Sequence, residues 1–218
     1  MPGVTISAGY GAGGSVVAPE VARLLGLPLL DRAISSAVAR QLQVTVAEAQ
    51  DGVARRSIGG RFLGLLTPLA GGVLGAGTDA APIDLAAGAD DAVEFREQAE
   101  NIMRQALDGG AVILGRAGAA ALAGEPRVLR VRLFGPADAR IAQAARLEGI
   151  DGATARSRLP GVDAARAHYV RRLYRADVDD PQLYHLQLDS TVLSLAGCAE
   201  VIVAGYRALL PGSQRSQT

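Results

Sequence analysis

The sequence contains no lysine, and all 22 of its basic residues are arginine. Any chemistry that normally uses an ammonium group must therefore use a guanidinium group or go without it. Cysteine is almost as scarce, because the single Cys198 can form no intramolecular disulfide bond. The chain also begins without a basic segment followed by an apolar one, so we expect a protein of the reducing cytoplasm.

Net charge is absent as well, since 22 basic residues balance 22 acidic ones. This balance argues against a non-specific nucleic-acid-binding protein, because such proteins neutralise phosphates with an excess of positive charge. The charge is nevertheless distributed unevenly. Residues 104–175 contain thirteen arginines and only six acids. We therefore expect an anionic ligand to lie against this part of the protein.

Uninterrupted apolar stretches long enough for a membrane helix are missing. Residues 62–78 carry no charge, but Pro68 and five glycines interrupt them, and a bilayer span needs about 20 consecutive apolar residues. We expect no stable membrane span. Material for a core is ample, because 49% of the 218 residues are hydrophobic and 20% are charged. This composition excludes disorder as the main state and predicts a globular domain.

Short apolar runs alternate with segments of helical periodicity. Strands are predicted at 4–7, 27–30, 111–114, 128–134 and 184–189, and helices at 15–25, 91–108, 136–147, 163–175 and 194–209. Such alternation is typical of an α/β fold with a parallel sheet, here of five strands. Ligands bind beyond the carboxyl ends of the strands in these folds. The segments that follow strands, and that we expect to line one crevice, are Gly9–Ser15, Asp31, Gly115–Arg116 and Asp189–Thr191.

The segment Gly9–Ser15, which we call the glycine loop, has one interpretation as a dinucleotide site. Gly9-x-Gly11-x-x-Gly14 with Asp31 at the end of the next strand matches the dinucleotide fingerprint, in which the acid holds a ribose hydroxyl group. Glycines there turn backbone N–H groups toward a phosphate at a helix N-terminus. A merely structural strand-to-helix turn is a further interpretation of the same residues.

The glycine loop also fits a degenerate phosphate-binding loop of the P-loop type. Its pattern is Ala8-x-x-x-x-Gly13-Gly14-Ser15. Gly14 then stands in the lysine position, and Ser15 stands where a hydroxyl group reaches magnesium. This interpretation and the dinucleotide interpretation rest on the same backbone geometry, so the loop alone does not decide between them.

The arginines of the second half favour phosphate chemistry. Arg171 and Arg175 are four residues apart on one predicted helix, so their charges repel unless an anion lies between them. Phosphoryl transfer needs several planar cations around a moving charged group, and a dehydrogenase has no comparable need. For any single arginine, a solvated salt bridge is the simpler interpretation. The group that favours function comprises Arg116, Arg140, Arg166, Arg171, Arg172 and Arg175.

Several segments together resemble the cytidylate kinase-like family. They are Thr5–Ser7, Gly11–Ser15, Leu29–Arg32, Val112–Arg116, Val162–Tyr174 and Asp179–Ser190. The resemblance covers most of the chain except about residues 53–88. It implies a three-layer P-loop fold that transfers the terminal phosphoryl group of ATP to CMP or dCMP with magnesium.

The same resemblance implies a domain organisation. One kinase-like domain would extend over residues 1–212, with a helical insertion on the monophosphate side at about 45–100. An arginine-rich lid would lie at about 150–180, and residues 213–218 would form a frayed tail.

It also implies roles for individual residues. The ATP phosphates would be held by Gly11, Ala12, Gly13, Gly14 and Ser15, with Ser15 also on magnesium. The catalytic cations would be Arg116, Arg166, Arg171 and Arg172, the last three as lid arginines. The acceptor nucleotide would be contacted by Asp31, Arg32, Arg116, Arg140 and Asp189.

Two departures from the pattern bear on activity. Gly14 replaces the lysine, and Ala117 rather than an acid follows Arg116. Losing one well-placed cation removes on the order of 3 kcal/mol of transition-state stabilisation, or about a hundredfold in rate, which a lid arginine would have to supply. Two alternatives therefore stay open: a nucleotide-binding protein without catalysis, and an enzyme that binds NAD through Asp31.

Overall fold

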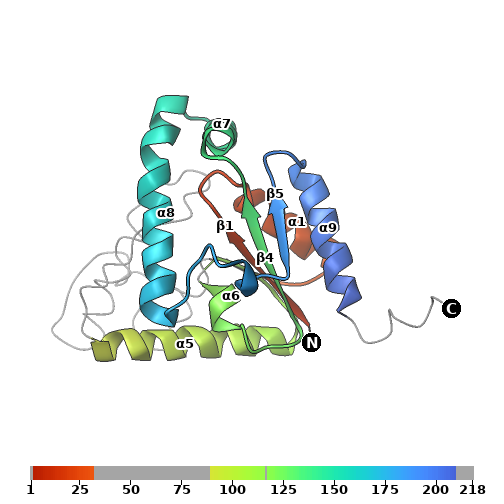
Figure 1. The fold of residues 1–218 in the computed structure, drawn as a ribbon. Coiled ribbons are helices and arrows are strands. Elements are labelled where there is room, and N and C mark those ends of the chain that lie inside the picture. The colour runs from red at the N-terminus through yellow and green to blue at the C-terminus, as the bar shows by residue number, and fades with distance from the viewer. Residues whose placement is uncertain (1, 32–88, 116, 210–218) are drawn as a thin grey trace, which may run out of the picture.

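The computed structural model describes residues 2–31, 89–115 and 117–209. Its centre is a sheet of five parallel strands in the order β2-β3-β1-β4-β5 (Figure 1). The strands are β1 (Gly3–Ala8), β2 (Leu29–Leu30), β3 (Val112–Leu114), β4 (Val128–Phe134) and β5 (Leu186–Asp189). The expected α/β fold with a five-stranded parallel sheet is confirmed. Because β1 is the central strand, the glycine loop that follows it lies at the middle of the carboxyl edge.

Helices cover both faces of this sheet and give it three layers. One face packs against α1 (Gly14–Leu25) and α9 (Leu195–Ala208), and Val4, Ile6 and Ala8 of β1 point into that core. The other face packs against α5 (Ala89–Asp108) and α6 (Gly118–Ala121) around a second core that includes Ile113. Every residue of β1 except Ser7 is buried, which suits a central parallel strand covered on both faces.

Two further helices reach the end of the sheet that carries the loops. They are α7 (Ala137–Glu148), after β4, and α8 (Gly152–Tyr174), and a short 3-10 helix (Pro181–Leu183) leads into β5. The two helices enclose a small core around Tyr10 of the glycine loop and Ile141 of α7. The side of α8 that faces the protein carries the buried residues Ala155, Val170 and Leu173, and we call it the inner side of α8.

Helix α8 begins earlier than the sequence predicted. The helix was expected at 163–175, and this start is wrong, since Pro160 and Gly161 lie inside the helix. The helix starts at Gly152, where the Asp151 carboxylate accepts hydrogen bonds from the Thr154 amide at 2.9 Å and its hydroxyl at 2.6 Å. This N-cap and the packing against α7 outweigh the backbone hydrogen bond that a proline inside a helix removes.

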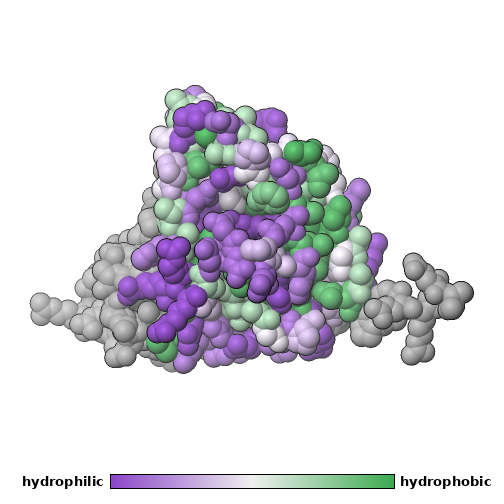
Figure 2. All heavy atoms as spheres, viewed as in Figure 1, coloured by the Kyte–Doolittle hydropathy of each residue, from purple (hydrophilic) through white to green (hydrophobic). Residues whose placement is uncertain are grey.

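Some expected features lie outside the described residues. They are Arg32, Arg116, residues 45–88 of the insertion, the uncharged residues 62–78 and the tail at 213–218. Across the described ranges, no helix combines the length and the apolar character that crossing a membrane requires. Figure 2 shows apolar side chains gathered along α9 and the turn after β5, where Val192 and Leu193 are exposed.

Arg175 offers a test of the end of α8. This exposed residue has φ 52 and so adopts the left-handed conformation, which costs a non-glycine residue about 1–2 kcal/mol. Arg175→Gly should therefore raise the free energy of unfolding by about 0.5–1 kcal/mol. The control, Arg171→Gly, places glycine in regular helix and should lower it by about 1 kcal/mol. Urea denaturation measures both, and a destabilised Arg175→Gly variant would contradict the assigned backbone conformation.

Candidate functional site

The glycine loop needs glycine at two positions. Gly11 and Gly13 have φ values of 73 and 76, which side chains disfavour. Space is also lacking, because a Cβ atom on Gly11 would overlap the Arg140 carbonyl oxygen and one on Gly13 would lie 2.5 Å from Leu195 Cδ2. Helix α7 and the start of α9 therefore approach the loop backbone as closely as glycine permits.

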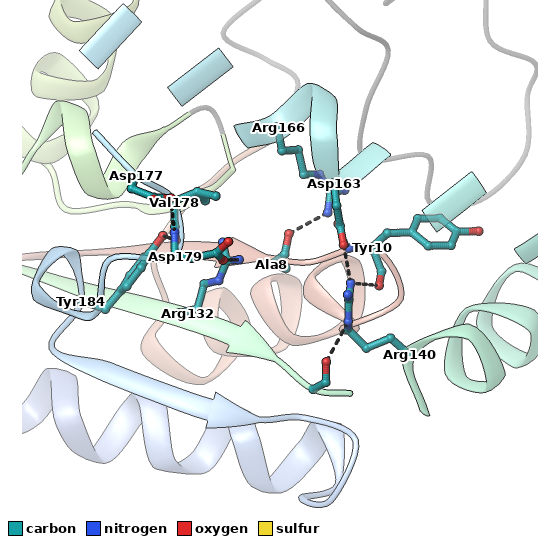
Figure 3. A network of polar contacts seen from close by, with 11 residues as sticks. Ala8, Tyr10, Arg132, Arg140, Asp163, Arg166, Asp177, Val178, Asp179 and Tyr184 are labelled. Carbon is teal, nitrogen blue, oxygen red and sulfur yellow. Dashed lines mark hydrogen bonds and ion pairs between the residues drawn. The ribbon is translucent and has the colours of Figure 1, made fainter. Parts of the chain in front are cut away.

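Four backbone carbonyls at this turn each accept a hydrogen bond from a distant side chain. They are Ala8 O from Arg166 Nη1 at 2.6 Å, Tyr10 O from Arg140 Nη1 at 2.9 Å, Gly11 O from Gln143 Nε2 at 2.9 Å and Ala12 O from Ser190 Oγ at 2.7 Å. The donors come from α8, from α7 and from the end of β5. Figure 3 shows the arginine contacts to Ala8 and Tyr10. These bonds fix the orientation of successive peptide planes.

The amide groups of the loop divide into two sets. The Tyr10 amide donates to Asp163 Oδ1 at 2.8 Å, and the Ala12 amide donates to Gly9 O at 3.0 Å. In contrast, the N–H groups of Gly13, Gly14 and Ser15 have no acceptor in the part of the chain that the structure describes. The N–H group of a trans peptide points away from the carbonyl of the preceding residue, so holding Ala12 O turns the Gly13 N–H group the opposite way. Consecutive amides at a helix N-terminus form an anion-binding site.

A half-buried ion pair locks two helices onto the loop. Arg140 Nη1 lies 2.8 Å from Asp163 Oδ2, and the two side chains are 12% and 31% exposed. Arg140 Nε also donates to Gly135 O at 2.9 Å, just after β4. One guanidinium group therefore joins α7, α8, the end of β4 and Tyr10 (Figure 3). Its expected contact with a monophosphate stays a prediction.

The arginines of α8 occupy different sides of the helix. Arg166 is on the inner side with Asp163, and its guanidinium group contacts Ala8 O. Arg171 and Arg172 are exposed and follow the buried Val170 by one and two positions, so they point away from that side. The structure brings Arg166 to the loop but not the other two, whose catalytic role stays a prediction.

The acidic candidates flank the loop from opposite edges of the sheet. Asp31 follows β2 and Asp189 ends β5, and these are the two edge strands. Four strand spacings of about 4.8 Å separate their backbones by roughly 19 Å. Hydrogen bonds from the Thr191 hydroxyl and amide lower the pKa of Asp189, so its carboxylate is ionised at neutral pH. Ser15 is exposed in the first turn of α1.

Sequence reasoning named some of the residues that shape the loop and missed others. Arg140 and Arg166 were expected at the site, Ser190 was expected only within the crevice segment Asp189–Thr191 and the resemblance, and Asp163 and Gln143 received no functional role. The structure places Gln143, 6% exposed, between the buried Ile141 and Ala144 on α7, a burial that the sequence alone did not indicate. Asp163 lies three positions before Arg166, which is the spacing of neighbours on one helix face.

A second polar cluster fastens the segment between α8 and β5. Arg132 Nη2 lies 2.7 Å from Asp179 Oδ1, and its guanidinium group stacks 5.8 Å from the centre of the Tyr184 ring. The Tyr184 hydroxyl donates to Val178 O at 2.8 Å (Figure 3). Burial raises the pKa of Tyr184, so it stays a hydrogen-bond donor at neutral pH. The cluster holds the segment that connects α8 with β5 against β4.

No other group of side chains in the described ranges indicates a metal site. Clusters of three or more metal-ligating residues do not occur among them. His185 Nδ1 accepts a hydrogen bond from the Arg130 amide at 3.2 Å, and partial burial lowers the pKa of His185. Cys198 is fully buried in the core beside α1, and burial raises the pKa of its thiol. Cys198 therefore serves packing, and His185 accepts a backbone hydrogen bond just before β5.

Ser190 tests the restraint on the loop. It is 1% exposed, and removing its hydroxyl group leaves the Ala12 carbonyl without this donor. Ser190→Ala should lower the free energy of unfolding by about 1–3 kcal/mol. The exposed Ser157, which donates to Thr154 O, is the control, and Ser157→Ala should stay within about 0.5 kcal/mol. Equal losses in chemical denaturation would show that the Ser190 bond does not restrain the loop.

The dinucleotide interpretation of the loop is wrong. Dinucleotide-binding folds of the Rossmann type order their strands 3-2-1-4-5-6, whereas this sheet has the order β2-β3-β1-β4-β5. Solved structures with the same fold include a gluconokinase from Sinorhizobium meliloti 1021, at 13% identity and TM-score 0.50 over 95% of this chain and 93% of that one. The fold is that of the P-loop kinases.

Two further solved structures resemble this one. A protein described as uncharacterized, from Eubacterium ventriosum ATCC 27560, has 15% identity and TM-score 0.66 over 95% of this chain and 99% of that one. The protein TT1252 from Thermus thermophilus has 18% identity and TM-score 0.51 over 96% and 97%. At these identities the likeness concerns the fold alone. No curated protein sequence matches the chain.

The decisive comparison is with a family model. The model of the cytidylate kinase-like family matches residues 3–192. This range includes all five strands and the residues that hold the glycine loop. The chain therefore belongs to the cytidylate kinase-like family.

Proposed function

We propose that the protein transfers the γ-phosphoryl group of ATP to a nucleoside monophosphate, CMP or dCMP. The observation that carries this proposal is that side chains hold the carbonyl of Ala8, just before the glycine loop, and those of Tyr10, Gly11 and Ala12 within it. The amides of the first turn of α1 are thereby left to bind phosphate oxygens. Membership of the cytidylate kinase-like family supports the same conclusion.

The reaction needs no side-chain base. An oxygen of the acceptor's phosphate is already anionic at neutral pH, and it attacks the γ-phosphorus of ATP. The bond between that phosphorus and the β,γ-bridging oxygen breaks, and ADP leaves with the electron pair. Catalysis then consists of positioning the two nucleotides and neutralising charge around the moving group. The candidate cations are Arg116, Arg166, Arg171 and Arg172.

The loop suits ATP with magnesium. The amides of Gly13, Gly14 and Ser15 would hold phosphate oxygens, and the Ser15 hydroxyl group would bind the metal. Magnesium commonly takes few protein ligands and keeps phosphate oxygens and waters for the rest, so one exposed hydroxyl group fits it. When bound, the ion neutralises charge on the β- and γ-phosphates.

The acceptor would lie beside the turn after β3. Gly115 and Ala117, on either side of Arg116, both have positive φ values, 73 and 56. A non-glycine residue in this conformation is strained, and such strain is concentrated at functional sites. We assign the monophosphate to Arg116 and further contacts to Asp31, Arg32, Arg140 and Asp189.

One observation favours a second candidate, a nucleotide-binding protein with little or no turnover. Gly14 stands in the lysine position, and the chain contains no lysine at all. The glycine loop would still bind phosphates through its backbone. The two candidates differ in whether ADP forms.

A ligand panel tests both candidates. Thermal unfolding is measured with ATP and magnesium, ATP and EDTA, CMP, dCMP, UMP and NAD. At a hundredfold excess over Kd, ATP with magnesium and the true acceptor should each raise Tm by about 5–10 °C. A coupled assay then measures ADP formation with that acceptor. Stabilisation without ADP identifies the second candidate, and stabilisation by NAD alone contradicts both.

Arg116→Ala tests the acceptor site. Losing a charge-assisted contact should weaken monophosphate binding by roughly 10- to 100-fold and leave ATP binding within about twofold. Isothermal titration measures both affinities. Arg127→Ala removes an exposed arginine next to β4 and serves as the control. An equal loss of ATP and monophosphate binding in the Arg116 variant would reject this assignment.

A further inference from the structure

The glycine at the lysine position is fixed by its surroundings. A Cβ atom on Gly14 would lie 2.7 Å from the Ala8 Cβ atom and 3.2 Å from Leu114 Cδ1. Ala8 is the last residue of β1 and is 9% exposed, and its methyl group has no rotamer that moves it aside. The Ala8 methyl group therefore fills the space in which a side chain at position 14 would begin. A lysine at position 14 would not fit unless Ala8 shifted.

The carbonyl group of the same residue anchors an arginine. Arg166 Nη1, from the inner side of α8, donates to Ala8 O at 2.6 Å (Figure 3). Ile6 O accepts a hydrogen bond from the Gly115 amide, so it faces the β3 side of β1. Residues two apart on a strand have the same orientation, so Ala8 O faces that side as well. The guanidinium group thus lies between the glycine loop and the turn after β3. In the proposed function, these two segments hold the donor and the acceptor.

The other described arginines of this region are less suited to a position between the glycine loop and the turn after β3. Arg140 is already bound to Asp163, Tyr10 O and Gly135 O. Arg171 and Arg172 are exposed away from the inner side of α8. Asp163 also accepts from the Tyr10 amide, which fixes α8 on the loop three residues before Arg166. Arg166 is therefore carried to the end of β1 by a rigid contact.

We propose that Arg166 supplies the cation that lysine supplies in ordinary phosphate-binding loops, and that Ala8 enforces this exchange. Its methyl group excludes a side chain at position 14, and its carbonyl group holds the replacement. This inference rests on the proposed function. A guanidinium group carries its N–H donors in a planar fork, so one donor can stay on Ala8 O while another binds a phosphate oxygen. Arg166 is then a catalytic residue that touches the β- and γ-phosphates.

The first experiment measures stability and needs no activity. Gly14→Ala should lower Tm by roughly 3–10 °C, because its new methyl group overlaps that of Ala8. In an Ala8→Gly background the same substitution should lower Tm by less than half as much. Equal losses in the two backgrounds would overturn the steric part of the proposal.

The second experiment measures nucleotide affinity and rate in Arg166→Gln. The initial rate with ATP and the monophosphate should fall by about a hundredfold or more. The Kd of ATP should rise about tenfold, whereas that of ADP, which lacks the γ-phosphate, should rise less. Arg156→Gln is the control, because Arg156 is exposed on α8 and pairs only with the exposed Asp138 among the described residues. If Arg166→Gln left both the initial rate and the ratio of the Kd of ATP to the Kd of ADP unchanged, the proposal would be overturned.

The third experiment is a rescue. In the Arg166→Gln background, Ala8→Gly together with Gly14→Lys should raise the initial rate at least about tenfold above that of Arg166→Gln. Gly14→Lys alone should not raise it. Rescue by Gly14→Lys alone would overturn the role of Ala8. If Ala8→Gly with Gly14→Lys failed to rescue the rate, the proposal that Arg166 replaces the loop lysine would be overturned. If the unaltered protein binds no ATP, the proposed function fails and the role of Arg166 fails with it. If the unaltered protein turns over ATP and Arg166→Gln changes neither the rate nor the nucleotide affinities, only the role of Arg166 fails and the proposed function stands.

Discussion

The restraint of the loop carbonyls is the interaction on which the rest of the site depends. A glycine-rich turn has many conformations of similar energy, and only a few of them direct consecutive N–H groups to one point. Here Arg166, Arg140, Gln143 and Ser190 each hold one carbonyl, and Asp163 holds the Tyr10 amide. The turn thus reaches its binding geometry without a ligand, which lowers the entropy lost when a phosphate binds.

The all-arginine composition has a structural meaning at this site. Arg140 bonds to a carboxylate and to two carbonyls on three segments, because its planar group carries donors in several directions. A lysine ammonium group is a compact point charge on a flexible stem and does not span such an arrangement with fixed geometry. The same property would let Arg166 combine its anchor on Ala8 O with the proposed role toward phosphate. Arginine is therefore both the scaffold and the source of charge.

Patterns that depend on neighbouring residues were readable from the sequence. The apolar runs located the strands, and the helical periodicity over 15–25 located α1, which ends at the Gly26 cap. The glycine loop could be interpreted as a phosphate site from the sequence because its spacing is local, and this interpretation stays a prediction. The identity of its supports was not readable, since it depends on which side of α7 and α8 faces the loop. Gln143 and Asp163 are ordinary polar helix residues until the folded chain brings them to Gly11 and Tyr10.

The start of α8 illustrates the same limit. Pro160 and Gly161 disfavour helix locally, yet Ala155 and Leu159 pack into the core around Tyr10, and the helix continues through the break. Arg166 and Arg171 also looked equivalent in sequence. Only the position of Val170 and Leu173, which are buried, decides that Arg166 faces the loop and Arg171 faces solvent.

The distance along the chain between the loop and its supports affects how the protein is made. Gly11 and its neighbours leave the ribosome early, but the partners of Tyr10, Gly11 and Ala12 follow 130 to 178 residues later. Contacts of such long sequence separation form slowly and late in folding. A nascent chain therefore carries the glycines without the rigid turn, and competence to hold nucleotide arises only once synthesis has passed Ser190. Ligand binding at this turn thus reports that the chain as far as Ser190 has been synthesised and folded.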